Sequence, residues 1–162
     1  KGVDVQNGAG TMELNKVNVS GFTMGVHASK GKVNIKGDST IEVIANGTGL
    51  MVSGNGATVS MTQGKIMGGG GSGTGLSVQN GTGTLTDVGI EGFKKGVEVT
   101  AGTLNINMGS IEFESGSGNY GVQVQNGASA IITGATIKGK GTGTGLYVMG
   151  TATMNGGGDK KC

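Results

Sequence analysis

Three nearly identical heptads constrain the fold of this chain more than any other feature of its sequence. They read GVDVQNG at 2–8, GLSVQNG at 75–81 and GVQVQNG at 121–127. In a compact globular domain each stretch of chain meets a different environment, so a recurring heptad indicates a recurring environment. We therefore expect a repeat protein.

Each repeat opens with a glycine followed by valine or leucine. Successive openings are 23, 24, 26, 21, 25 and 24 residues apart. A mean of about 24 residues is well below the roughly 40 of a propeller blade, and the spacing is too irregular for hexapeptide solenoids. It is the size of one turn of a parallel β-helix. The predicted turns begin at residues 2, 25, 49, 75, 96, 121 and 145.

Apolar pairs with a period of two residues predict three short strands in every turn, as at 50–52, 104–106 and 111–113. Stacked turn on turn about 4.8 Å apart, these apolar side chains would fill one continuous dry interior. The residues between them would point outward. On the first strand the predicted outward column is Asp4, His27, Met51, Ser77, Glu98, Gln123 and Tyr147.

Composition excludes several classes of protein. Glycine supplies 38 of the 162 residues, and 12 Lys against 10 Asp and Glu leave a net charge of +2. That charge is too small and too evenly spread for a nucleic-acid-binding surface. No window approaches the roughly 20 apolar residues of a membrane helix, and no signal peptide opens the chain. We expect no membrane insertion, and a fragment or processed piece of a longer protein.

The rhythm of the turns carries a resemblance to a known family. GVEVTAGTLNINMGSIEF (96–113) and GVHASKGKVNIKGDSTIEV (25–43) share Gly-Val, Gly-Thr-Leu and Gly-Ser-Ile elements. In these the chain resembles passenger domains of Gram-negative (type V) autotransporters, in particular the Gly- and Met-rich passengers of Bartonella. The resemblance implies an all-β, right-handed, single-stranded parallel β-helix (β-solenoid) of about seven turns, one domain over 1–162. Its motif is the turn itself, which is specific for architecture rather than activity.

The resemblance also implies where the chain acts. Such passengers leave the cell through a C-terminal outer-membrane translocator barrel, which we expect to be missing from this fragment. They are commonly adhesins, toxins or signalling mimics, and one Bartonella passenger is an angiogenic, growth-factor-like virulence factor. We therefore expect a secreted or surface-exposed, non-enzymatic chain that binds a host cell-surface receptor protein. The alternatives are a polysaccharide-acting β-helix enzyme and a purely structural stalk.

One acidic pair supports the enzyme alternative. Aligning 88–91 with 111–114 and 135–138 stacks Glu91, Glu114 and Lys138 in successive turns about 5 Å apart. Carboxylates at that separation can perform retaining glycoside hydrolysis. The favoured interpretation is an exposed acidic pair beside a lysine.

No metal or cofactor site is expected. His27 is the only histidine, and without a second ligand or a nucleophile in a matching column we interpret it as a surface imidazole. Cys162 is the only cysteine, so it can form no internal disulfide but could link two chains. A ladder of outward threonines, as an ice-binding solenoid requires, is not apparent in the strand columns.

Candidate binding residues comprise a basic set, an apolar set and the outward Glu98 of the first-strand column. Lysines of the second turn and of the C-terminal region are candidates for contacts with acidic glycans. Met51, Met67 and Tyr147 are candidates for a partner patch, whereas Met12, Met61 and Met154 are expected to fill gaps in the core. Uncapped ends also invite end-to-end pairing. The candidate binding residues are Lys30, Lys32, Lys36, Met51, Met67, Glu98, Lys138, Lys140 and Tyr147.

Overall fold

The computed structural model describes residues 1–8 and 10–156, which form strands and turns without a helix. Each turn contributes a first, a second and a third strand. The first strands are β1 (Val3–Val5), the second halves of β3 (Asn18–Ala28) and β5 (Thr40–Val52), β8 (Thr74–Val78), β11 (Lys95–Val99), β14 (Tyr120–Val124) and β17 (Thr144–Val148). The second strands are β2 (Thr11–Asn15), β4 (Lys32–Lys36), β6 (Thr58–Thr62), β9 (Thr82–Thr86), β12 (Gly102–Asn107), β15 (Ala128–Thr133) and β18 (Thr151–Asn155). The third strands are the first halves of β3 and β5, with β7 (Lys65–Gly68), β10 (Gly89–Phe93), β13 (Ser110–Phe113) and β16 (Thr136–Gly139).

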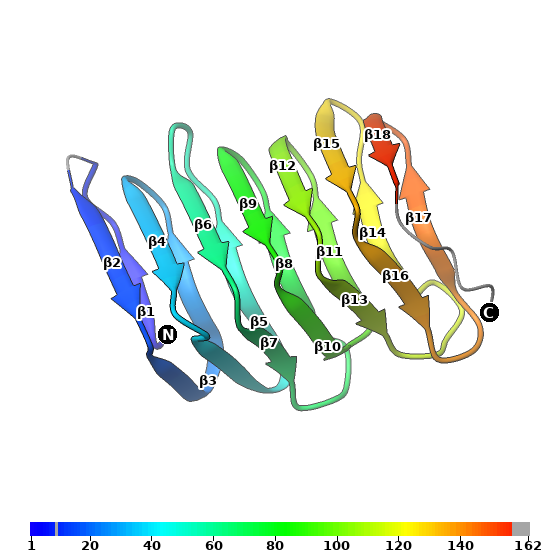
Figure 1. The fold of residues 1–162 in the computed structure, drawn as a ribbon, viewed down its shortest axis with the longest axis horizontal. Helices are drawn as coiled ribbons and strands as arrows, with labels where there is room; N and C mark the ends of the chain where they lie inside the picture. The colour runs from blue at the N-terminus through cyan, green and yellow to red at the C-terminus, as the bar shows by residue number, and fades with distance from the viewer. Residues whose placement is uncertain (9, 157–162) are drawn as a thin grey trace.

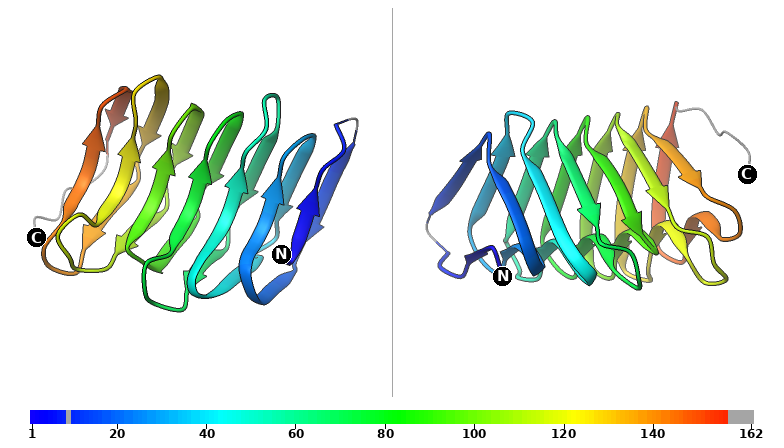
Figure 2. Two further views of the ribbon diagram at one scale, coloured as in Figure 1. Left: turned by 180° about the vertical axis from the view of Figure 1, so that it is seen from behind. Right: turned by 90° about the horizontal axis from the view of Figure 1, so that it is seen from below.

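Every strand pairs in parallel with its equivalents in the neighbouring turns (Figure 1). The second strands form a seven-stranded sheet, and the first and third strands share an 11-stranded sheet because β3 and β5 run through the corner between them. The first strands ascend on the far side of Figure 1 and the second strands descend on the near side as the chain advances, and the view from behind in Figure 2 agrees. This winding is right-handed.

The predicted parallel β-helix is therefore confirmed. The described residues make six complete turns plus the two strands β17 and β18 of a further turn, close to the expected seven. The glycine-rich segment 67–75 forms the corner between β7 and β8, where the sequence placed it.

The interior consists of stacked apolar columns. Leu50, Leu76 and Val97 of the first strands are all 0% exposed, because each is covered by the turn before and the turn after. The third strands contribute one nearly uniform column. In paired register it comprises Val19, Ile41, Ile66, Ile90, Ile111 and Ile137.

This column corrects the expected third-strand alignment, which placed Ile90 opposite Phe113. Ile90 pairs with Ile111, and Phe113 pairs with Phe93 beyond a register shift that includes Gly92. Phe93 is buried at 1% exposure, although it falls outside the period-two pattern. A slip of two residues leaves every side chain on its original face, so the apolar pattern alone cannot detect it.

The glycine that opens each turn is required by close backbone approach. A Cβ at Gly75 would lie 2.5 Å from the carbonyl oxygen of Gly96 and 2.5 Å from Cγ2 of Ile90. Equivalent contacts would meet a side chain at Gly49 and Gly121. The Gly-Val/Leu signature therefore marks the place where successive turns touch through their backbones.

The first and last described turns are less well covered. Of the methionines expected in the second-strand core column, Met61 is 0% exposed, but Met12 is 42% and Met154 is 37% exposed. The prediction that all three are buried is wrong, because among the described residues the strands of Met12 and Met154 each have a partner strand on only one side. In a solenoid, burial depends on both neighbours.

Candidate functional site

The first strands carry the outward column that the sequence predicts. The pairing follows the order Asp4, His27, Met51, Ser77, Glu98, Gln123 and Tyr147 without interruption. The column is nevertheless not uniformly open to solvent, since His27, Ser77 and Gln123 are buried. Neighbours about 4.8 Å away on either side cover much of each side chain. The interpretation of His27 as a free surface imidazole is therefore wrong.

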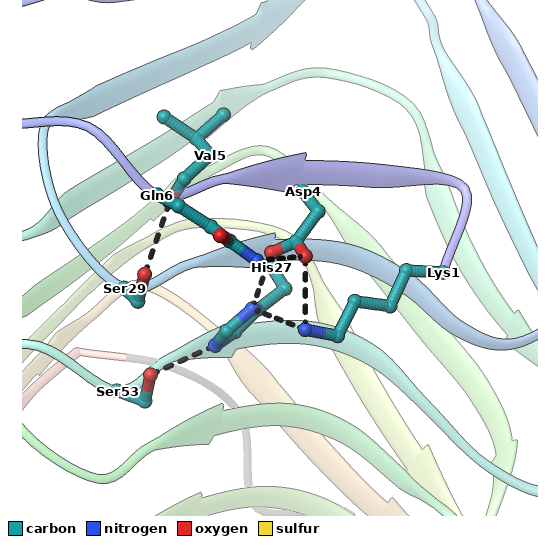
Figure 3. Close-up of polar contacts among 7 residues, drawn as sticks. All are labelled: Lys1, Asp4, Val5, Gln6, His27, Ser29 and Ser53. Carbon is teal, nitrogen blue, oxygen red and sulfur yellow. Dashed lines mark hydrogen bonds and ion pairs between the residues drawn. The ribbon is translucent and has the colours of Figure 1, made fainter.

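At its N-terminal end this column assembles a hydrogen-bonded triad across three successive turns (Figure 3). Asp4 of β1 lies on one side of His27 of β3, with Oδ1 2.7 Å from the imidazole Nδ1. Ser53, the residue after β5, lies on the other side, with Oγ 2.8 Å from Nε2. We call Asp4, His27 and Ser53 the column triad.

The charge of Asp4 determines how this triad is protonated. Its carboxylate accepts hydrogen bonds from Lys1 Nζ at 3.0 Å and Gln6 Nε2 at 2.7 Å. The bond from Lys1, with that from His27, lowers the pKa of Asp4 to about 2. An ionised Asp4 can only accept, so Nδ1 of His27 carries a proton, and in the neutral imidazole Nε2 then accepts from the Ser53 hydroxyl. Lys1 Nζ also lies 3.2 Å from Nδ1.

Sequence reasoning missed Ser53 because it considered only residues inside strand columns. A usable signal was present: Ser53 follows the outward Met51 by two residues, so it continues the same face. Its backbone N–H donates to the Ala28 carbonyl at 3.0 Å, which extends the strand geometry by one residue into the corner.

The C-terminal half of the column forms a second polar and aromatic surface. The rings of Tyr120 and Tyr147 are 5.3 Å apart at an interplanar angle of 39°. Beside them Lys95 Nζ pairs with Glu98 Oε1 at 2.8 Å, and the buried Gln123 stands between Glu98 and Tyr147 in register. We call these five residues the tyrosine face. It unites the predicted binding residues Glu98 and Tyr147.

The proposed catalytic pair of Glu91 and Glu114 is not formed. Glu91 pairs with Met67 before the register shift in β10, whereas Glu114 follows Phe113 beyond it. Lys138 pairs with Glu112, not with Glu114. The stack predicted from the sequence is therefore wrong. The cause is the same two-residue difference between the expected and the observed pairing of the third strands.

Glu112 and Glu114 instead enclose Lys140. Its Nζ lies 2.8 Å from Glu114 Oε1 and 3.3 Å from Glu112 Oε1, and Lys138 Nζ lies 3.6 Å from Glu112 Oε2. The bonds to Glu114 and Glu112 raise the pKa of Lys140. These predicted basic residues therefore form part of a locally neutralised cluster.

The predicted basic residues of the second turn are all exposed. Lys32 and Lys36 begin and end β4, and Lys36 Nζ pairs with Glu13 Oε2 at 3.2 Å. Lys30 precedes β4 at the corner. Hydrogen bonds from Asn34 and Lys36 lower the pKa of Glu13. This group is a strip of mixed charge with excess lysine.

The two methionines predicted to form a partner patch occupy different columns. Met51 pairs with His27 and Ser77 on the first strands. Met67 pairs with Glu42 and Glu91 on the third strands. Both side chains are half-buried. The strand pairing therefore does not place Met51 and Met67 in one column, as a shared patch would require.

The outer face of the seven-stranded sheet corrects another expectation. Thr58, Thr82 and Thr103 pair in consecutive turns, as do Ser60 and Thr84. An outward hydroxyl ladder therefore exists, although the sequence reading found none. The outward residues from β6 to β18 are uncharged: Thr58, Ser60, Thr62, Thr82, Thr84, Thr86, Thr103, Asn105, Asn107, Ser129, Ile131, Thr133, Thr151, Thr153 and Asn155.

Several candidate features are not found among the residues that the structure describes. The described residues contain no group of three or more His, Cys, Asp or Glu side chains that could hold a metal ion. No helix there is long and apolar enough to cross a membrane. Cys162, the candidate for linking two chains, lies outside the described residues.

The fold and the outward column define this chain as a right-handed parallel β-solenoid with a structured polar face. Comparison with protein-family models, curated proteins and solved structures finds no match.

Proposed function

We propose that the chain is an extracellular or cell-surface binding module of the autotransporter-passenger type, which recognises a host cell-surface receptor protein through its tyrosine face. The observation that carries this proposal is the Tyr120–Tyr147 pair on a rigid sheet. Tyrosine is enriched at the energetic centres of protein interfaces because its ring is large, amphipathic and has few rotatable bonds.

The surroundings of the pair support recognition rather than simple solvation. Tyr147 is 39% exposed, and Met149, two residues further along the chain, is 51% exposed. The Lys95–Glu98 ion pair beside them is already formed, so a partner would meet oriented charges. A preformed surface loses little conformational entropy on binding. Under this proposal binding itself is the activity, and no catalytic step is assigned to the tyrosine face.

The test is binding of the purified chain to cultured human endothelial cells, with cell proliferation measured in parallel. We expect saturable binding that persists at high salt, because an aromatic contact is little screened. Tyr147→Ala should weaken binding at least about tenfold, which corresponds to about 1.4 kcal/mol. Ile131→Ala, which removes a 48% exposed side chain from the seven-stranded sheet, is the matched control and should bind normally.

Other outcomes would identify the alternatives. Absence of saturable binding would contradict the proposal and favour a structural stalk. Binding abolished by modest salt would instead favour an acidic glycan, for which Lys30 and Lys32 are the candidates because they form no ion pair with a described residue. Equal weakening by both substitutions would exclude the tyrosine face as the recognition surface.

A further inference from the structure

We infer that the column triad is a nucleophilic acyl-transfer site, in which Ser53 attacks carboxylic esters, His27 is the general base and Asp4 positions His27. This inference is independent of the receptor-binding proposal, because the two use opposite ends of the outward column. It rests on the order of the three side chains and on their hydrogen bonds.

The contacts have the connectivity that nucleophilic serine catalysis requires. A serine hydroxyl becomes a useful nucleophile when a neutral imidazole accepts its proton and a carboxylate holds that imidazole in the correct tautomer. His27 Nε2 lies 2.8 Å from Ser53 Oγ, and Nδ1 lies 2.7 Å from Asp4 Oδ1. The two bonds use opposite nitrogens of one ring, so a neutral imidazole protonated on Nδ1 presents Nε2 to the Ser53 hydroxyl.

The solenoid holds this arrangement rigidly. Asp4, His27 and the residue preceding Ser53 belong to β1, β3 and β5, and the central strand β3 pairs directly with both β1 and β5. The inward neighbours of His27, Val26 and Ala28, are both 0% exposed. His27 is itself only 9% exposed. A site built on packed parallel strands retains its geometry without a ligand, which is a condition for efficient catalysis.

The corner after Ser53 leaves the hydroxyl accessible to a substrate and provides a backbone hydrogen-bond donor. Ser53 is half-buried, whereas Asn55 and Gly56 are exposed, so a substrate can approach the hydroxyl from the corner. The N–H of Gly54 donates to no acceptor among the described residues. A backbone N–H directly after the nucleophile is a common contributor to an oxyanion hole. Gly54 packs against the Ser29 carbonyl too closely for a side chain.

The chemistry balances with an ester and water as the only reactants. Ser53 Oγ forms a bond to the ester carbonyl carbon while its proton moves to His27 Nε2. The carbon–alkoxide bond then breaks, and His27 returns the proton to the leaving alcohol. Water, deprotonated by His27, attacks the acyl-serine, which releases the carboxylic acid and regenerates the Ser53 hydroxyl.

The first test uses a fluorophosphonate probe, which forms a covalent bond with activated serines, followed by peptide mass mapping. We expect labelling of the peptide that contains Ser53 and loss of at least about nine-tenths of it in Ser53→Ala and His27→Gln. Ser29→Ala is the matched control, because Ser29 occupies the equivalent corner one turn earlier but donates its hydroxyl to the Val5 carbonyl at 3.3 Å. It should label normally, as should Tyr147→Ala.

The second test measures hydrolysis of p-nitrophenyl acetate by the same variants, with circular dichroism and urea midpoints to verify folding. Asp4→Asn should lower kcat at least about tenfold with little change in KM, because Asp4 acts on His27 rather than on substrate. A merely structural carboxylate would change the urea midpoint without this split. An unlabelled wild-type chain, or labelling that persists in folded Ser53→Ala, would overturn the inference.

Discussion

Single residues explain why the sequence repeats its opening dipeptide. The opening glycine lies where the backbones of adjacent turns touch, and the valine or leucine after it enters the core. Each turn therefore opens with glycine because adjacent backbones leave no room for a side chain there, and the next residue is apolar because it is buried. A β-solenoid permits change at outward positions but not at this contact.

This contact predicts an unequal cost for one substitution at equivalent positions. Gly75→Ala should lower the free energy of unfolding by about 1–3 kcal/mol, because the new methyl group would overlap the Gly96 carbonyl and Ile90. Gly145→Ala is the matched control, since its methyl group would meet only Ile137 at 3.7 Å. Urea unfolding of both variants measures the difference. Equal stabilities would contradict the backbone-contact explanation.

At the scale of elements, the third strands show how a column of equivalent residues holds neighbouring turns together. Ile66 of β7 lies between Ile41 of β5 and Ile90 of β10, and all three are at most 1% exposed. In the same register Glu91 and Glu114 do not occupy paired positions on neighbouring strands. A small error in pairing thus changed both the predicted core and the predicted enzyme site.

Removing one member of the column should be costly. Ile66→Ala should lower the free energy of unfolding by about 2–5 kcal/mol, because the cavity is enclosed by turns on both sides. Ile131→Ala in β15, where the side chain is 48% exposed, should change stability by no more than about 0.5 kcal/mol. Chemical denaturation tests the pair. Similar costs would show that the apolar column is not the source of cohesion between turns.

The whole molecule is a linear stack in which each turn contacts only its neighbours. Stability should therefore vary along the axis, with central turns supported on two sides and the end turns on one. The exposure of Met12 and Val148, against full burial of Leu76 and Val97, shows the same gradient in packing.

Native hydrogen exchange should reveal this gradient. Amides of β8 and β9 should exchange at least about tenfold more slowly than those of β2 and β18, because opening an end turn disrupts only one interface. Exchange detected by mass spectrometry on peptides from each turn measures the profile. Uniform protection from β2 to β18 would instead indicate that the stack unfolds as one cooperative unit.

The sequence predicted much of this architecture because a solenoid repeats one local environment. The 24-residue interval, the inward apolar pairs and the order of the first-strand column could all be read from residue types, since each depends on alternation along a strand. The receptor and the cellular location stay predictions, and the acyl-transfer site inferred for the column triad stands against the expectation that the chain is not an enzyme.

Register and burial required the folded chain. Glu91 does not meet Glu114 because β10 pairs with β13 two residues away from the expected register, with Ile90 opposite Ile111, and a slip of two residues preserves the alternation of faces, so no period-two pattern can detect it. That His27 lies between Asp4 and Ser53 depends on side chains from three turns converging over a distance of a few ångströms. Strand periodicity depends on neighbouring residues and can therefore be predicted from the sequence. Contacts between turns join residues that are distant in the sequence, so only the folded structure determines them.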